Sequence, residues 1–197
     1  FDELKKNAIS ADQLRVLGDY CNEIDIKFGL SLFRVCDLVD LEMLKDLIDF
    51  YKIPSAECLN IPLIDTLIQF GKRVFVSTGG TETKTILKIL QKYSKKIILM
   101  HCISNYPSKM GGQDLKVLQT LRAEGFPELG YSSHDENWEI CLLAMAFGAE
   151  WIERHLTKDK NLIGLDHSSS SEESELKKLV HFAECYQKVV GRDFHTP

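Results

Sequence analysis

Polar side chains recur where predicted strands end, at five consecutive places along the chain. They are Lys52, Ser55 and Glu57 at the first place, Ser77 to Gly80 at the second, Ser104 to Tyr106 at the third, Tyr131 to His134 at the fourth, and His155 and Thr157 at the fifth, with Asp166 and His167 in the loop beyond. In parallel α/β folds, ligands bind where the strands end and the following loops begin. Five such clusters in succession therefore predict one shared site.

His134 and His155 end neighbouring predicted strands and could share a metal ion, since imidazole is a common metal ligand. Simpler explanations stay open at this point. Lys52 could be a surface lysine whose aliphatic stem covers an apolar run. The STGG segment at 77–80 could be turn chemistry, and a histidine at a strand end is more often hydrogen-bonded than metal-bound.

Short apolar runs alternate with helix-like segments along the whole chain. Strands are predicted near 27–33, 51–54, 73–76, 96–103, 128–131 and 150–154, and helices over 11–25, 40–50, 61–71, 82–94, 113–125, 137–148 and 174–191. Ser170 and Glu173 have the spacing of a capping box before the last helix. Strands that alternate with helices indicate a parallel sheet built from right-handed βαβ units.

Two parallel folds fit this alternation, a (β/α)₈ barrel of the TIM type and an open doubly wound sheet. A barrel of about 250 residues uses roughly 31 residues per unit. The 197 residues therefore hold about six units, and a complete barrel would lack its first two strands. No glycine-rich dinucleotide fingerprint follows any predicted strand, which weakens the doubly wound alternative.

Composition excludes several classes of protein. Hydrophobic residues make up 44% and charged residues 27%, values typical of a globular protein with a real core. The net charge of −5 gives no basic surface for nucleic acid. The six cysteines are widely spaced and indicate reduced thiols in a cytoplasmic protein. No apolar stretch approaches the roughly 18 residues that suggest a membrane span. The start at Phe1 suggests a fragment.

Six segments in one order resemble the sialic acid synthase family, which comprises N-acetylneuraminate synthase and its legionaminic and pseudaminic acid relatives. The segments are YKIPSAECLNIPLI, VFVSTGGTET, LMHCISNYPS, LGYSSHDEN, GAEWIERHLTKDK and GLDHSSSSEESEL. The resemblance implies a (β/α)₈ barrel that condenses phosphoenolpyruvate with N-acetylmannosamine or a similar sugar. It also implies a divalent metal, Mn²⁺ or Mg²⁺, and a homodimeric full-length protein.

The resemblance assigns roles to individual residues. Matches to phosphoenolpyruvate-binding positions are Lys52, Ser55, Ser77, Ser104 and Ser132, with a looser match at Ser31. His134 and His155 match two metal ligands, which suit an open site completed by water and substrate rather than a closed zinc site. Glu57, Tyr106 and Asp166 match positions that contact the amino sugar, and Glu57 is also a catalytic candidate.

This sequence departs from the family pattern in three respects. The resemblance implies two further N-terminal strands, which carry an active-site glutamate and lysine, and a C-terminal antifreeze-like domain; we expect residues 1–197 to be the partial barrel domain. Ser133 stands where Asp is common. Two alternatives remain: a catalytically inactive barrel fragment that still binds the phosphate ligand, and a barrel aldolase that uses Lys52 as a Schiff base.

Overall fold

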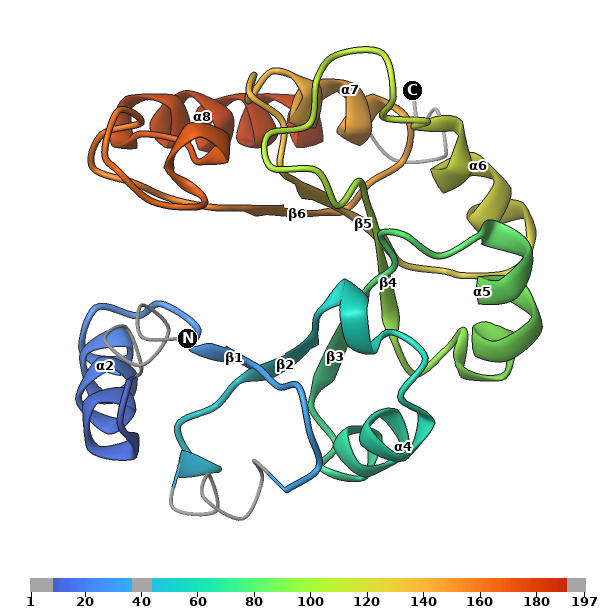
Figure 1. Ribbon diagram of the computed structural model, residues 1–197, viewed down its shortest axis with the longest axis horizontal. Coiled ribbons are helices and arrows are strands. Elements are labelled where there is room, and N and C mark those ends of the chain that lie inside the picture. Colours follow the sequence, from blue (N-terminus) through green and yellow to red (C-terminus); the bar gives the residue numbers. More distant parts are fainter. Residues whose placement is uncertain (1–8, 37–43, 191–197) are drawn as a thin grey trace, which may run out of the picture.

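The structure is a computed structural model that describes residues 9–36 and 44–190. Six parallel strands form one sheet in sequence order: β1 (Gly29–Ser31), β2 (Phe50–Ile53), β3 (Arg73–Ser77), β4 (Ile98–Cys102), β5 (Leu129–Ser133) and β6 (Trp151–Arg154). Figure 1 shows that the sheet curls, with β1 and β6 at the two ends of the curl. This curled, open α/β sheet confirms the predicted incomplete barrel.

Helices follow the strands in the order expected of βαβ units. They are α2 (Ala11–Glu23), α4 (Ile61–Gln69), α5 (Thr83–Leu90), α6 (Lys116–Ala123), α7 (Ile140–Ala146) and α8 (Glu173–Val190), with short 3₁₀ turns η2 (Ser55–Glu57), η3 (Gln91–Tyr93) and η4 (His167–Ser169). In Figure 1, α4, α5, α6 and α7 lie around the outside of the curl. No helix in the described ranges is long and apolar enough to cross a membrane.

Two local predictions were wrong. The helix expected over 40–50 is not formed in its described part, where a turn over 45–47 leads into β2 at Phe50. Residues 40–43 lie outside the described ranges. Tertiary contacts hold this turn, because Asp49 Oδ2 accepts a hydrogen bond from Phe28 N at 2.9 Å and Lys72 donates to the carbonyl of Ile48. The capping box also fails, since the Ser170 hydroxyl donates to Asp166 O instead of capping α8.

The two faces of the sheet have different compositions because successive strand residues point to opposite sides. The outer face packs against the helices in the main hydrophobic core, which contains Tyr51, Ile53, Val74, Val76, Leu99 and Leu129. On the inner face, an aromatic layer of Phe50, Phe75 and Trp151 packs around Met100. Polar residues follow this layer toward the carboxyl ends of the strands, so the inner face carries the candidate site.

Candidate functional site

An ion pair crosses the inside of the curl. Lys52 Nζ, on β2, lies 2.9 Å from Glu153 Oε2, on β6, although three strands separate β2 from β6 in the sheet. Both residues line a cavity of about 690 Å³ whose other walls include Asp49, Phe50 and Trp151, so this cavity lies toward the amino ends of the strands, below the ion pair. Burial raises the pKa of the Glu153 carboxyl. The Lys52 ammonium and the Ser132 hydroxyl lower this pKa by more than burial raises it, so the net shift is downward. Glu153 is therefore a carboxylate at neutral pH.

Sequence reasoning missed Glu153, although a signal for it was present. Trp151, Glu153 and His155 alternate along β6 and its extension. Residues two apart share a face of a strand. The prediction that His155 takes part in the site therefore also implied that Glu153 faces it.

Three serine hydroxyls surround the buried thiol of Cys102, the last residue of β4. Burial raises the pKa of this thiol, while Ser55, Ser132, Ser104 and the Lys52 ammonium act in the opposite direction. The thiol thus stays protonated and neutral. Four of the five residues predicted to hold an anion, one ammonium and three hydroxyls, lie around this one side chain.

Gly79 makes room for this serine cluster. Its N–H donates to Ser55 Oγ at 3.0 Å. A Cβ atom at Gly79 would lie 2.1 Å from Ser104 Oγ and 3.1 Å from Cys102 Sγ. Only glycine therefore lets the backbone approach the hydroxyls this closely, which leaves an N–H and several O–H groups at one place.

Ser77, the fifth predicted anion ligand, is buried at the end of β3 with 2% exposure. Among the described residues its Oγ has no hydrogen-bond partner. Buried hydroxyls are normally paired, because an unpaired one costs free energy. An unpaired donor on the inner face can donate to an anionic ligand.

The two predicted metal ligands lie next to each other. The rings of His134 and His155 have centroids 5.2 Å apart and are nearly perpendicular, at 84°. Tyr106 lies against His134 with ring centroids 4.0 Å apart, and against His155 at 6.1 Å. Cys102 Sγ lies 3.6 Å from His134 Nδ1, which joins the histidine pair to the serine cluster.

Each imidazole has its Nδ1 engaged. His134 Nδ1 lies 3.0 Å from the carbonyl oxygen of Ile103, which can only accept, so a neutral ring must donate from Nδ1. His155 Nδ1 lies 3.5 Å from Asp166 Oδ2. Burial and the neighbouring His134 lower the pKa of His155, although Asp166 and Glu153 oppose this shift. With Nδ1 engaged in both rings, Nε2 is the nitrogen of each imidazole that remains to face a ligand.

This donor set fits a divalent metal ion. Metal-binding histidines usually donate their other ring N–H to a carbonyl or carboxylate, which fixes the ring and increases its basicity. The part of the chain that the structure describes holds no group of three or more His, Cys, Asp or Glu residues suited to a metal. The two histidines thus fit an open site, in which water and substrate complete the coordination.

Two other predicted residues lie at the edge of this arrangement. Glu57, in η2, accepts a hydrogen bond from Asn60 Nδ2 at 2.9 Å. Within the described ranges, no hydrogen bond or ion pair joins Glu57 or Ser77 to the other site residues. Ser31 ends β1 in register with Lys52, so the two share the inner face.

Ser133, where the resemblance leads one to expect Asp, faces away from the site. It is 1% exposed, and its hydroxyl donates to Asp135 Oδ2 at 2.8 Å. The carboxylate at this end of β5 therefore belongs to Asp135, two residues further along the chain.

Residues 1–194 match the NeuB family. The chain is 36% identical to N,N'-diacetyllegionaminic acid synthase of Campylobacter jejuni, over 96% of this chain and 62% of that protein. It is 31% identical to human N-acetylneuraminate-9-phosphate synthase, over 92% of this chain and 51% of that protein. The chain thus spans about half to three-fifths of the length of these two relatives.

Comparison with solved structures agrees with these sequence matches. The N-acetylneuraminic acid synthetase of Leptospira borgpetersenii, solved in complex with citrate, superposes with a TM-score of 0.83 and 34% identity, over 96% of this chain and 67% of that one. A truncated 3-deoxy-D-arabino-heptulosonate 7-phosphate synthase from Thermotoga maritima shares the fold at 17% identity, with a TM-score of 0.77 over 93% of this chain and 74% of that one. The sequence match over nearly the whole chain, together with this shared fold, shows that the chain belongs to the NeuB family.

Proposed function

We propose that this chain carries the barrel part of a synthase that condenses phosphoenolpyruvate with N-acetylmannosamine or a related amino sugar. The products would be a nine-carbon sugar acid and phosphate. One observation carries the proposal: a lysine ammonium and a cluster of serine hydroxyls lie beside two imidazoles whose Nδ1 atoms are engaged. Relatives named as synthases of this class support it.

The anion subsite is assigned to five side chains, namely Lys52, Ser55, Ser77, Ser104 and Ser132. Phosphoenolpyruvate carries a phosphate and a carboxylate on three carbons, so it needs several donors within a small volume. Hydrogen bonds to ionised groups are about twice as strong as neutral ones. Among these donors, the Ser77 hydroxyl has no hydrogen-bond partner within the described residues, so it is available to the anion. Glu153 neutralises Lys52 in part and so limits non-specific anion binding.

The sugar subsite is assigned to Tyr106, Asp166 and Glu57, with Mn²⁺ or Mg²⁺ held by His134 and His155. When bound, the ion supplies Lewis-acid polarisation of the sugar's aldehyde oxygen. Burial raises the pKa of Tyr106, with smaller contributions from Cys102, Asp166 and Glu153, so its phenol stays a donor. Asp166 also orients His155.

The chemistry proceeds by bond changes that these residues position. The C2=C3 π electrons of phosphoenolpyruvate form the new bond to the aldehyde carbon, the aldehyde C=O π bond breaks, and its oxygen takes up a proton. Water adds at the electron-poor C2 and loses one proton. The C2–O bond to phosphate then breaks as the new hydroxyl loses its proton, which leaves the ketone and inorganic phosphate. Lys52 and the serines hold the phosphate through both steps. Glu57 orients the sugar hydroxyls or transfers the proton.

Phosphate release tests the proposal. The polypeptide as it occurs in nature is mixed with phosphoenolpyruvate, N-acetylmannosamine and Mn²⁺, and inorganic phosphate is measured. His134→Ala and His155→Ala should abolish turnover, while His181→Ala, on the exposed side of α8, should leave it unchanged. Full activity of His134→Ala or of His155→Ala would contradict the proposal that these two histidines hold the metal ion. Phosphoenolpyruvate binding without phosphate release would favour the alternative of an inactive barrel that keeps its anion site.

A further inference from the structure

A second polar network lies on the outer face of β5 and β6, behind the histidine pair. Its centre is the carboxylate of Asp135, which is 1% exposed. Tyr131 and Ser133 donate to Asp135 Oδ2 at 2.7 and 2.8 Å, and Gln113 Nε2 donates to Oδ1 at 2.9 Å. Both carboxylate oxygens are therefore occupied by protein donors, and Asp135 is held rigidly. We refer to these residues with Arg154 and Ser171 as the outer network.

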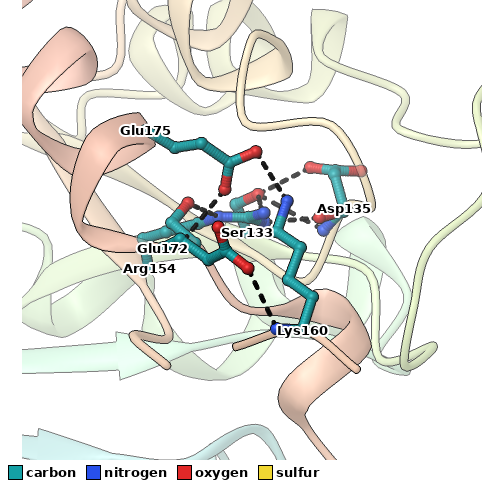
Figure 2. A network of polar contacts seen from close by, with 7 residues as sticks. Ser133, Asp135, Arg154, Lys160, Glu172 and Glu175 are labelled. Atoms are coloured by element: carbon teal, nitrogen blue, oxygen red, sulfur yellow. Dashed lines mark hydrogen bonds and ion pairs between the residues drawn. The ribbon is translucent and has the colours of Figure 1, made fainter. Parts of the chain in front are cut away.

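Arg154, the last residue of β6, connects this network across the two strands. Its Nη1 donates to Ser133 Oγ at 3.0 Å and to the main-chain oxygen of Asp135 at 2.5 Å, and its Nε donates to Ser171 Oγ at 2.9 Å. Figure 2 shows Arg154 reaching Ser133 and Asp135 from the neighbouring strand. Because the guanidinium is planar, these contacts fix β5, β6 and the segment before α8 in one arrangement.

Residues of the outer network lie next to the two site histidines in the sequence. Ser133 and Arg154 are paired in register as the last residues of their strands. His134 and His155 come directly after them. Asp135 then follows His134, so the outer network holds the backbone on both sides of His134 and immediately before His155.

The backbone on the far side of each histidine is held as well. Ser108 N donates to the carbonyl of His134 at 2.8 Å, and Ser171 N donates to the carbonyl of His155 at 2.8 Å. Ser171 thus contacts the main chain of His155 with its amide and the side chain of Arg154 with its hydroxyl.

The same region fixes the loop that carries Asp166. Lys160 Nζ lies 2.6 Å from Glu175 Oε1, and the Lys160 amide donates to Glu172 Oε1 at 3.1 Å. Glu172 N in turn donates to Glu175 Oε2 at 3.0 Å. Figure 2 shows these three residues beside Arg154. The loop between β6 and α8 is therefore tied to the start of α8.

We infer that Arg154 and Asp135 are positioning residues that set the separation and orientation of the His134 and His155 imidazoles from the outer face of the sheet. Neither side chain faces the proposed substrates. Their effect passes through the main chain, because a rotation of the backbone at residue 134 or 155 would turn one ring relative to the other. The inference rests on the proposed function only in taking this pair of rings to be the ion site.

The test uses Arg154→Met, which keeps an unbranched apolar stem and removes the guanidinium with its fork of donors. A matched control is Arg122→Met. Arg122 contacts the Pro127 carbonyl, the Gly148 carbonyl and Glu150, so it joins the segments that precede the same two strands. Arg154 thus joins the carboxyl ends of β5 and β6, whereas Arg122, on α6, joins the segments at their amino ends.

Two quantities are measured on the natural polypeptide and on each variant made in it. The first is the NMR signals of the imidazoles in the absence of metal; Arg154→Met should shift those of His134 and His155, and Arg122→Met should not. The second is Mn²⁺ affinity by electron paramagnetic resonance. Loss of a group that orients metal ligands typically lowers affinity about 10- to 100-fold. Arg154→Lys, which can keep one contact, should recover part of the affinity, and Asp135→Asn should lower it without a change of side-chain size.

The outcomes separate this inference from the proposed function. If Arg154→Met and Asp135→Asn both leave the two histidine signals and the Mn²⁺ affinity equal to those of Arg122→Met, the positioning role is overturned. If the histidine signals shift but the unsubstituted protein binds no Mn²⁺, the positioning role stands and the proposed ion site fails. Should Arg154→Met not fold, Arg154→Lys and Asp135→Asn decide the question on the same two readouts.

Discussion

Substitution of Ser77 by alanine separates a structural hydroxyl from one kept for a ligand. Ser77 is 2% exposed, and its Oγ has no partner within the described ranges. Burying an unpaired hydroxyl costs about 1–3 kcal/mol in proteins. Ser77→Ala removes that cost together with the group, so the free energy of unfolding should stay the same or rise by up to about 2 kcal/mol.

The affinity for phosphoenolpyruvate should fall in Ser77→Ala, although the stability does not. A hydrogen bond to a charged group contributes about 1.5–3 kcal/mol, which corresponds to roughly a 10- to 150-fold weaker affinity for phosphoenolpyruvate. Urea unfolding measures the stability, and calorimetric titration with phosphoenolpyruvate measures the affinity. The variant should thus be as stable as the parent, or more so, and bind the anion poorly.

The control lies one residue along the chain. Thr78 is also buried, but its hydroxyl donates to Met100 O at 3.3 Å. Thr78→Val keeps the shape and removes a paired hydroxyl, so it should cost about 1 kcal/mol of stability and leave the affinity unchanged. If Ser77→Ala instead loses more than about 1 kcal/mol while binding the anion normally, the reasoning from the unpaired hydroxyl is refuted.

Two further predictions follow from the same geometry. Gly79→Ala should leave the fold intact, because the clash is with the Ser104 hydroxyl, at 2.1 Å, and this hydroxyl can turn away by rotation about χ1. The displaced hydroxyl should weaken phosphoenolpyruvate binding at least about 10-fold. Gly112→Ala, with open space around it, is the control for calorimetry. Burial lowers the pKa of His101 from its ordinary value of 6.5, although the carbonyl of Gln113 opposes this shift. The unfolded chain therefore binds a proton first, and stability present above pH 6.5 should be lost as the pH falls, by at most about 1.4 kcal/mol per pH unit, in urea unfolding. His101→Gln should reduce that slope; an unchanged slope would contradict the assignment.

The strand order and the clustering of polar residues could be predicted from sequence because both follow from local patterns. Apolar runs such as residues 96–103 mark buried strands, and residues at the ends of parallel strands must share an edge. Strand ends were less certain. β5 continues to Ser133, two residues beyond the prediction, because Ser132 and Ser133 have partners in the sheet and in the outer network.

The missed features depend on contacts between residues far apart in sequence. The segment 40–50 has a helical sequence pattern, but the Asp49 side chain accepts a hydrogen bond from the Phe28 amide, which lies far away in the sequence. In the sequence, Arg154 is a single charged residue directly before His155. Its role follows from Ser133 and Ser171, which lie 21 and 17 residues away in the chain, so spacing within a motif gave no sign of it.

The two faces of the sheet explain why function and rigidity do not compete for the same side chains. The aromatic layer of Phe50, Phe75 and Trp151 lies below the polar pair of Lys52 and Glu153 on the inner face. The Lys52 side chain is only 11% exposed, and a charge that is largely buried interacts more strongly with an anion than it would in water. The helices cover only the outer face, so the inner polar groups can stay unpaired, as Ser77 does, at a cost that the outer core offsets. The alternation of side chains along each strand thus lets one sheet hold a stable core and an unsatisfied site a single residue apart.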